Sequence, residues 1–210
     1  AACGGIGANV ENPARFLYEN AMMGLMLLEE GRQHGLKKFV LISTTCSYPK
    51  DDPLPLQEDS IWTGKPVGAT GPYGMAKRLL HEACETYGRQ YDLPCAVLVP
   101  ANLYGPEDHF EEEKSHVIPA IIRRYVEAQD VGLEQVSNWG SGTPTREFLH
   151  VADAAEAIAL AVEKDVECVP INLGTGIETS IAELTELIAS TVGYNGEVFW
   201  DTSKPDGQPK

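Results

Sequence analysis

The stretch KKFVLISTTCSY, residues 37–48, decides the fold of this chain. Its first half, Lys37 to Ile42, ends in a short apolar run that is typical of a parallel β-strand covered on both faces. Its second half, Ser43 to Tyr48, places several hydroxyl groups and one thiol directly after that strand. Open α/β sheets keep their ligands at the carboxyl ends of their strands. We therefore predict an α/β fold with a Rossmann-like, doubly wound parallel sheet and a ligand site at this strand end.

A second motif, Tyr73-Gly74-Met75-Ala76-Lys77, follows the pair Gly71-Pro72, which is typical of a helix start. The i,i+4 spacing puts the side chains of Tyr73 and Lys77 on one helix face. A cation near a phenol lowers the pKa of the phenol, which suits Tyr73 to exchange a proton with a substrate. The spacing also occurs on solvated helix faces, so the strand-end hydroxyls carry part of the argument. Together the two motifs indicate a redox enzyme that polarises a ketone beside a nicotinamide.

Alternating helices and strands are predicted along the rest of the chain. Asn12 to Gly35 predicts a helix, with Asn12 as its cap, Pro13 in its first turn and Gly35 as its stop. Pro94 to Val99 predicts the next strand of the sheet. The remaining expectations are a proline-rich loop at 53–66, helices at 117–128, 151–163 and 180–191, and strands at 169–173 and 197–200.

Two domains are expected, although the length alone does not decide between one and two. Residues 1–106 would form a partial Rossmann-like domain. Residues 107–210 would form mainly a small α/β substrate-binding lobe, with about 165–176 returning to the Rossmann sheet. The chain opens without a Gly-x-x-Gly-x-x-Gly turn and without Met. We therefore expect a fragment whose first strands and phosphate-binding turn lie outside these residues.

The composition excludes several classes of protein. The chain has 31 acidic and 16 basic residues and a formal net charge of −15. This charge argues against a nucleic acid or an anionic membrane as partner, because phosphate contacts need clustered Lys and Arg. No apolar stretch approaches the length of a membrane span. Five cysteines without a C-x-x-C pair fit reduced thiols better than a disulfide frame or a metal site, so a cytoplasmic protein without a metal is expected.

Eight short segments carry a resemblance to a known family. They are GGI (4–6), STTCSYPK (43–50), PYGMAK (72–77), PANLYGP (100–106), SHVIPA (115–120), WGSGTPTREFLH (139–150), NLGTG (172–176) and SKPDGQP (203–209). With them the chain resembles the extended short-chain dehydrogenase/reductases of the NAD-dependent epimerase/dehydratase family. It is most similar to the branch that epimerises C3 and C5 of GDP-4-keto-6-deoxy-D-mannose and then reduces C4 with NADPH.

The resemblance implies five catalytic residues. Tyr73 would protonate the ketone oxygen during reduction, and Lys77 would also hold the nicotinamide ribose. Thr44 would assist as a hydroxyl where the family more often has Ser. Cys46 and His116 would exchange the protons on C3 and C5, because the 4-keto group acidifies these protons and Cys and His are residue types that serve as acids and bases after modest tuning by their surroundings.

Each of the two epimerisation residues also has a structural interpretation. An isolated Cys is more often a small buried hydrophobe, and an isolated His more often a helix cap or a core residue. The family pattern favours catalysis for Cys46 and His116. Structural roles are expected for the histidines outside the pattern, His34, His81 and His109.

The resemblance also implies the binding residues. The cofactor is expected to be NADP(H), with NAD(H) as the alternative, because the segment that would choose between them is absent. The implied cofactor contacts are Ile42, Ser43, Thr44, Thr45, Tyr73, Lys77, Pro100, Asn102, Leu103 and His116. The implied contacts to a nucleotide-sugar substrate are Arg124, Trp139, Arg146, Lys204 and Asp206. An Arg suits a diphosphate because its planar fork makes paired charge-assisted bonds, although a structural salt bridge is an equal alternative.

Two alternative functions remain open. A related 4-epimerase or 4,6-dehydratase is the first alternative, although the dehydratase usually carries a Glu where this chain has Thr45 and Cys46. A non-catalytic cofactor-binding protein is the second, and the complete catalytic set argues against it.

Helix 12–35 has a broad apolar face, for which core packing is favoured. The resemblance implies instead a homodimer through helices 12–35 and 73–91. The face consists of Met22, Met23, Met26, Leu27 and Leu28.

Overall fold

The computed structural model describes residues 1–2, 4–111, 115–204 and 206 of the chain. Cys3, residue 205 and residues 207–209 of the SKPDGQP segment therefore lie outside the described residues. The chain divides into two compact units. The first unit comprises 1–103 and 149–174, and the second comprises 104–148 and 175–210.

A parallel sheet forms the centre of the first unit. Its strands are β1 (Phe39–Ile42), β2 (Cys95–Pro100) and β6 (Pro170–Leu173), in the order β1-β2-β6. All of them pair in parallel, with Phe39 opposite Cys95 and Val97 opposite Pro170. The predicted α/β fold with a parallel sheet is thus confirmed, including the return of residues 169–173 to that sheet.

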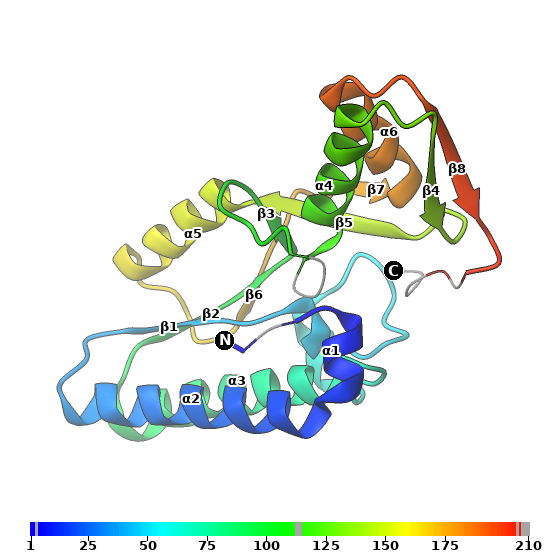
Figure 1. Cartoon of the computed structure of the whole chain (residues 1–210). Helices are drawn as coiled ribbons and strands as arrows, with labels where there is room; N and C mark the ends of the chain where they lie inside the picture. Colours follow the sequence, from blue (N-terminus) through cyan, green and yellow to red (C-terminus); the bar gives the residue numbers. More distant parts are fainter. Residues whose placement is uncertain (3, 112–114, 205, 207–210) are drawn as a thin grey trace. The chain divides into compact units, whose positions relative to one another are not determined.

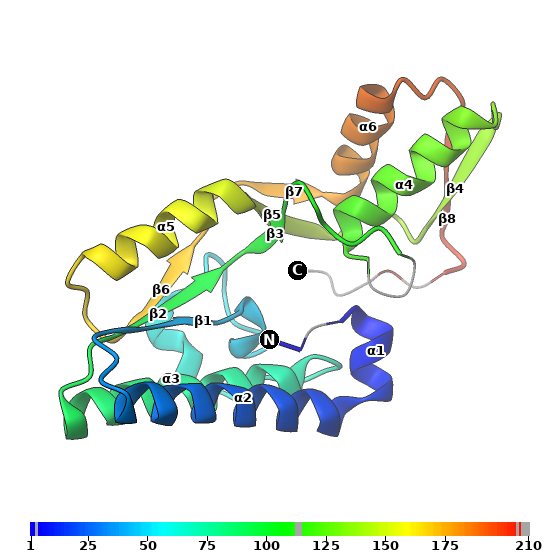
Figure 2. The ribbon, with the colours of Figure 1, turned by 60° about the vertical axis from the view of Figure 1, so that its left-hand side comes forward.

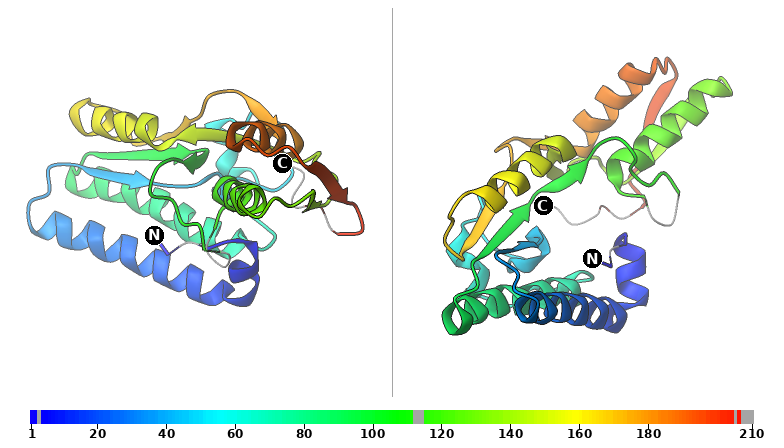
Figure 3. Two further views of the ribbon diagram at one scale, coloured as in Figure 1. Left: turned by 45° about the horizontal axis from the view of Figure 1, so that its top comes forward. Right: turned by 90° about the vertical axis from the view of Figure 1, so that its left-hand side faces the viewer.

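Helices cover both faces of this sheet (Figures 1 and 3). The helices of the first unit are α1 (Ile6–Glu11), α2 (Pro13–Gln33), α3 (Gly71–Tyr91) and α5 (Val151–Glu163). Every residue of β2 is buried, and successive side chains alternate between two apolar clusters. Cys95 and Val97 pack with residues of α2 and α3, whereas Ala96 and Leu98 pack with Ala161 of α5. This burial on both faces explains why the strands have unbroken apolar sequences.

The start of α2 differs from the prediction. The Asn12 side chain does not cap α2; its amide donates to the carbonyl of Ala8 at 3.3 Å and so closes α1, which the sequence did not predict. Pro13 takes the first helical position, where a missing N–H costs no hydrogen bond. Gly35 follows the helix with φ 74°, a left-handed conformation that Gly adopts without strain, so the predicted stop is confirmed.

The apolar residues of α2 do not form one buried face. Leu28 is only 1% exposed, whereas four neighbours are 39% to 59% exposed. The exposed side chains are Met22, Met23, Met26 and Leu27. The cause is that α2 packs on α3 along one side, where Gly24 lies against Leu80. The expectation of core packing is confirmed for Leu28 and wrong for the other four.

In its described residues, the second unit contains two helices and a parallel strand pair (Figure 2), which share a buried apolar core. Its helices are α4 (Val117–Asp130) and α6 (Ile181–Val192), and its parallel strand pair is β4 (Gln135–Trp139) with β8 (Glu197–Asp201). Ile121 and Tyr125 of α4, Val136 of β4 and Ile188 of α6 belong to one buried cluster. Ser180 caps α6 by a reciprocal pair of bonds with Glu183, which fixes the start of this helix.

Short strands complete the described secondary structure. They are β3 (Asn102–Tyr104), β5 (Thr145–His150) and β7 (Glu178–Ser180), in the order β3-β5-β7. The sequence predicted none of these strands, nor β4. Two 3-10 turns also form, η1 (Thr45–Ser47) directly after β1 and η2 (Glu58–Trp62) within the proline-rich loop.

The compact units differ from the expected domain limits at α5. The sequence assigned 151–163 to the substrate-binding lobe, but this helix belongs to the first unit. The reason is that Ala161 packs with Ala96 and Leu98 of the sheet. Residues 149–174 therefore return to the first unit, a longer segment than the expected 165–176.

Adjacent residues of α6 test the core of the second unit. Ile188 is buried in the apolar cluster, whereas Leu187 is 63% exposed. We expect Ile188→Ala to lower the free energy of unfolding by about 2–5 kcal/mol, because it leaves a cavity. Leu187→Ala should change it by less than about 0.5 kcal/mol. Urea unfolding measures both, and equal effects would contradict the packing described here.

Candidate active site

The hydroxyl and thiol groups after β1 lie on a tight turn. Thr44 has extended backbone angles and begins η1, and its Oγ1 accepts a hydrogen bond from the backbone N–H of Cys46 at 3.2 Å. The side chains of Thr44, Thr45 and Cys46 are half-buried, whereas Ser43 and Ser47 are buried. The turn therefore presents Thr44 and Cys46 next to each other at the carboxyl edge of the parallel sheet.

The start of α3 lies directly against this turn. Lys77 is 6% exposed, and its Nζ donates to the carbonyl oxygen of Ile42 at 2.7 Å. The same Nζ lies 5.8 Å from the ring centroid of Tyr73. The structure thus places Tyr73 and Lys77 on one helix face, as predicted, and brings Lys77 to the end of β1.

Arg78 and His81 of α3 form hydrogen bonds with the buried side of the turn. Arg78 is 5% exposed, and its guanidinium donates to the carbonyl oxygens of Ser47 and Gly64. His81 is also buried and shares a hydrogen bond with the hydroxyl of Ser43. Sequence reasoning missed Arg78 and assigned His81 only a structural role. A spacing signal was available only for His81, because it follows Lys77 by four residues and so lies on the same helix face.

The surroundings of His81 keep its imidazole neutral. Burial, and after it the nearby positive charges of Lys77 and Arg78, lower the pKa of His81 to about 4. A neutral ring can form the bond to Ser43 without bringing a third positive charge into this buried region. The pKa shift thus follows from the position of His81 behind the turn.

The other predicted cofactor residues follow the next strand of the same sheet. Pro100 ends β2 and lies opposite Leu173 of β6. Ala101 continues the pairing, with its N–H bonded to the Leu173 carbonyl at 2.8 Å. Asn102 and Leu103 come next and are exposed. Because β1, β2 and β6 are parallel, their carboxyl ends form one edge of the sheet, as in folds that bind ligands there.

Predicted substrate residues group at the end of β4 in the second unit. Trp139 is 69% exposed, and the Nζ of Lys204 lies 5.6 Å from its ring centroid. Arg124 of α4 donates to the side-chain oxygen of Asn138 at 2.9 Å. Asp206 accepts bonds from the backbone N–H and the hydroxyl of Ser141, at 2.6 and 2.8 Å. Asp206 therefore holds the loop that follows Trp139.

His116 and Arg146 occupy other positions of the second unit. His116 precedes α4, is exposed, and does not cap that helix with its side chain. Arg146 lies in β5, and its guanidinium donates to the carbonyl of Thr145 at 2.6 Å. Burial lowers the pKa of Arg146. Sequence reasoning missed Asn138, which is buried and links Arg124 to the hydroxyl of Tyr125.

In the described ranges, no group of three or more His, Cys, Asp or Glu side chains is arranged to hold a metal ion. Among the helices of the described part, none is long and apolar enough to cross a membrane.

Comparison with known proteins identifies the family. The model of the NAD dependent epimerase/dehydratase family matches residues 1–174. The chain belongs to this family. It is 42% identical to a GDP-L-fucose synthase of Escherichia coli (strain K12), covering 100% of this chain and 68% of that protein. It is 39% identical to GDP-L-fucose synthase 1 of Arabidopsis thaliana, covering 100% of this chain and 65% of that protein. The chain thus spans about two thirds of the length of these relatives.

Solved structures of the family have the same fold. A GDP-mannoheptose C4 reductase from Campylobacter jejuni with NADP bound has a TM-score of 0.88 and 28% identity, over 98% of this chain and 69% of that one. A GDP-L-fucose synthetase from Naegleria fowleri bound to NADP has a TM-score of 0.83 and 30% identity, over 91% of this chain and 61% of that one. The predicted resemblance to this family is confirmed.

His81 gives a test based on pH. Its pKa is about 4 in the folded chain and 6.5 in its ordinary state, so the unfolded chain binds more protons between these values. The free energy of unfolding should therefore fall as the pH is lowered from 6.5 to 4, by about 3 kcal/mol from this group. His81→Gln should flatten this part of the pH profile, as measured by urea unfolding. His34→Gln, at an exposed position, is the control, and an equal effect of both substitutions would contradict the assignment.

Proposed function

We propose that the protein is a GDP-L-fucose synthase, which epimerises C3 and C5 of GDP-4-keto-6-deoxy-D-mannose and reduces C4 with NADPH. The observation that carries the proposal is the turn with Thr44 and Cys46 lying against the helix turn with Tyr73 and Lys77. A ketone polarised at such a site can be reduced, and its neighbouring carbons become acidic. The names and identities of the relatives support the choice of substrate.

The carboxyl edge of the sheet fits a dinucleotide cofactor. Residues 42–45 and 100–103 follow adjacent parallel strands, the position where this fold binds nucleotides. Residues Ile42, Ser43, Thr44, Thr45, Pro100, Asn102 and Leu103 would contact the cofactor there, and we propose His116 as a further cofactor contact. Bound NADPH would supply a hydride to C4. The NADP-bound relatives favour NADP(H) over NAD(H).

In the reduction, the residues of the first unit handle the proton. Tyr73 would donate its phenolic proton to the ketone oxygen as negative charge develops there. The hydroxyl of Thr44 would donate a second hydrogen bond, because the bond from the N–H of Cys46 uses a lone pair of Oγ1 and not the hydroxyl proton. Lys77 would favour the phenolate that remains and bind the nicotinamide ribose. Its buried amine is already oriented by the Ile42 carbonyl.

In the epimerisation, Cys46 and His116 would remove and return the protons on C3 and C5. The structure supports these roles by weakening the structural interpretations of both residues. Cys46 is half-buried and belongs to none of the apolar clusters in the described part, unlike Cys84 and Cys95. His116 is exposed and does not cap its helix with its side chain. The enolate oxygen would bind to the same donors that serve the reduction, Tyr73 and Thr44.

The second unit would bind the nucleotide sugar. Arg124 and Arg146 would contact the diphosphate, and Trp139 with Lys204 would form a flat cationic surface beside it. Arg124 bonds to the neutral amide of Asn138, which supports a binding role over a structural salt bridge. Asp206 would act by holding the loop at Ser141. Of the remaining alternatives, the dehydratase usually has Glu where this chain has Thr45 and Cys46, and the names of the relatives favour the proposed activity over a 4-epimerase.

Exchange of substrate protons tests the proposed function. In the full natural protein that contains this chain, Cys46→Ser and His116→Asn should slow the exchange of the C3 and C5 protons by about 10²–10⁴-fold. The dissociation constant of NADPH should change little in Cys46→Ser. The measurement is NMR of the 4-keto sugar in heavy water without NADPH. Matched controls are Cys168→Ser and His109→Asn, and wild-type exchange in both test variants would refute the epimerase assignment.

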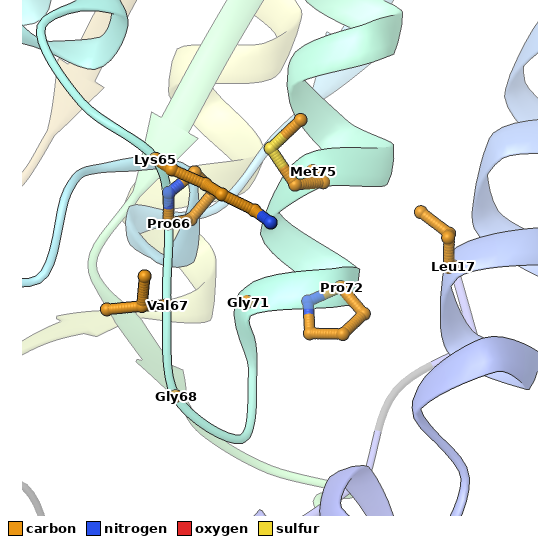
Figure 4. A pocket seen from close by; sticks show the side chains of 8 residues that line it. All are labelled: Leu17, Lys65, Pro66, Val67, Gly68, Gly71, Pro72 and Met75. Carbon is orange, nitrogen blue, oxygen red and sulfur yellow. The ribbon is translucent and has the colours of Figure 1, made fainter.

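The exposed face of α2 supports a homodimer. Met22, Met23, Met26 and Leu27 form this face, and a hollow at the start of α3 is lined in part by α2 (Figure 4). Leu17 of α2 and Pro72 and Met75 of α3 line the hollow with residues 65–68 and Gly71. A contiguous apolar surface of this kind is typical of an interface. We propose that α2 and α3 pair with those of a second copy, in a cytoplasm that keeps the free thiols reduced.

Light scattering of the full natural protein tests this surface. We expect a dimer for the wild type and about hundredfold weaker association for Leu27→Glu, because the substitution places a charge in an apolar interface. Leu187→Glu, at an exposed position of α6, is the control and should leave the mass unchanged. A monomeric wild type, or an unaltered dimer in Leu27→Glu, would refute the proposed interface.

A further inference from the structure

Gly74 lies in the first turns of α3, between Tyr73 and Met75, where the backbone gives no reason for a glycine. Its φ is not among the positive glycine φ angles of the described chain. In the interior of a helix, Ala is more stable than Gly by about 1 kcal/mol. The helix alone therefore favours Ala at this position. The reason for Gly74 must lie in what α3 contacts.

The contact is the backbone of the turn that carries Cys46. A Cβ atom at Gly74 would lie 2.0 Å from the carbonyl oxygen of Cys46 and 2.8 Å from its carbonyl carbon. It would also lie 3.2 Å from the Cβ of Pro66 on the neighbouring loop. Real Cβ atoms do not come closer than 3.0 Å to such neighbours. Helix and turn would have to separate by about 1 Å, the difference between 3.0 and 2.0 Å.

Neither side of this contact can yield easily. Further along α3, the side chains of Lys77, Arg78 and His81 each form a hydrogen bond with the segment from Ile42 to Ser47. These bonds end on backbone carbonyls of the turn or on a buried hydroxyl. Moving the turn by 1 Å would therefore strain several hydrogen bonds at once.

Two other helical glycines allow a comparison of what a Cβ atom would contact. A Cβ at Gly24 in α2 would meet Leu80 at 2.3 Å, but the nearest atom is the end of a flexible side chain. A Cβ at Gly88, in the same helix as Gly74, would have its nearest contact at 3.4 Å, an ordinary distance. Of the three, only Gly74 faces the backbone of a predicted catalytic residue.

We propose that Gly74 is a positioning residue that sets the distance between the helix bearing Tyr73 and Lys77 and the turn bearing Thr44 and Cys46. The absence of a side chain lets the two backbones touch, so the proton donor for reduction and the thiol for epimerisation share one substrate position. This inference rests on the proposed function for its catalytic consequence. The close approach itself does not depend on it.

A displacement of 1 Å is large for catalysis. Misplacing a reacting group by this distance can cost about 10²-fold in rate, because the donors no longer match the position of the developing charge. Both partial reactions should suffer, since Thr44 and Tyr73 serve both. The proton exchange that needs Cys46 should fall at least as much as the reduction.

The experiment compares three Gly-to-Ala variants in the full natural protein. Gly74→Ala should lower ketone reduction and C3/C5 proton exchange by roughly 10–100-fold. Gly88→Ala should leave both rates unchanged. Gly24→Ala should lower the unfolding midpoint because it crowds Leu80, without lowering the rates of the folded protein. This variant separates loss of stability from loss of position.

A second measurement needs no turnover. The tryptic peptide 39–50 contains Cys46 as its only cysteine, so its alkylation by iodoacetamide can be followed by mass spectrometry. Gly74→Ala should alkylate roughly threefold faster than wild type, because the turn moves away from α3. If Gly74→Ala does not fold, Arg78→Lys loosens the same turn without adding atoms and should also alkylate faster.

The outcomes are distinct. Wild-type rates and wild-type alkylation in folded Gly74→Ala would overturn the positioning role. Lower stability with normal rates and normal alkylation, as expected for Gly24→Ala, would also overturn it. If the wild-type protein neither reduces nor exchanges the 4-keto sugar, the proposed function fails. Faster alkylation in Gly74→Ala would then still support the positioning role.

Discussion

The structure of the first unit depends on the close packing of α3 against the end of β1. Lys77 reaches the Ile42 carbonyl, Arg78 reaches Ser47, and Gly74 lies against Cys46. These contacts use one face of α3 and three backbone carbonyls, so the turn cannot shift alone. Because α3 is packed against the buried sheet in this way, the side chains at the start of α3 and on the turn are held in a fixed geometry. Loops that carry function commonly need such a rigid support.

The sequence predicts the sheet well because both of its faces are buried. Unbroken apolar runs at 37–42 and 94–99 are typical of such strands, and the structure confirms them. The sequence does not predict β4, in which burial alternates but Asn138, a polar residue, takes a buried position. That amide bonds to Tyr125 and Arg124, contacts that no local pattern reveals. The apolar face of α2 shows a related limit, because composition does not tell which side of a helix another element covers.

The candidate site was predictable where a motif fixed its spacing. Tyr73 and Lys77 lie on one helix face because four residues make about one turn. Arg78, Gly74 and Asn138 could not be predicted from such a motif, because their importance arises from distant backbone carbonyls and a distant phenol. The cysteines show the same difference. The sequence placed Cys46 after a strand end, whereas only the folded chain shows that Cys84 and Cys95 are buried among apolar side chains.

The strong acidity of the chain is compatible with an anionic ligand because two cationic side chains near the proposed sites, Arg78 and Arg124, bind neutral oxygens. Arg78 donates to two carbonyl oxygens, and Arg124 donates to an amide oxygen. A guanidinium bonded to a neutral oxygen is held in place but keeps its charge, whereas a carboxylate partner would cancel it. The net charge of −15 describes the whole surface, and the local field at a site depends on the few groups that line it. Local arrangement of charge thus decides which ligands an acidic protein can bind.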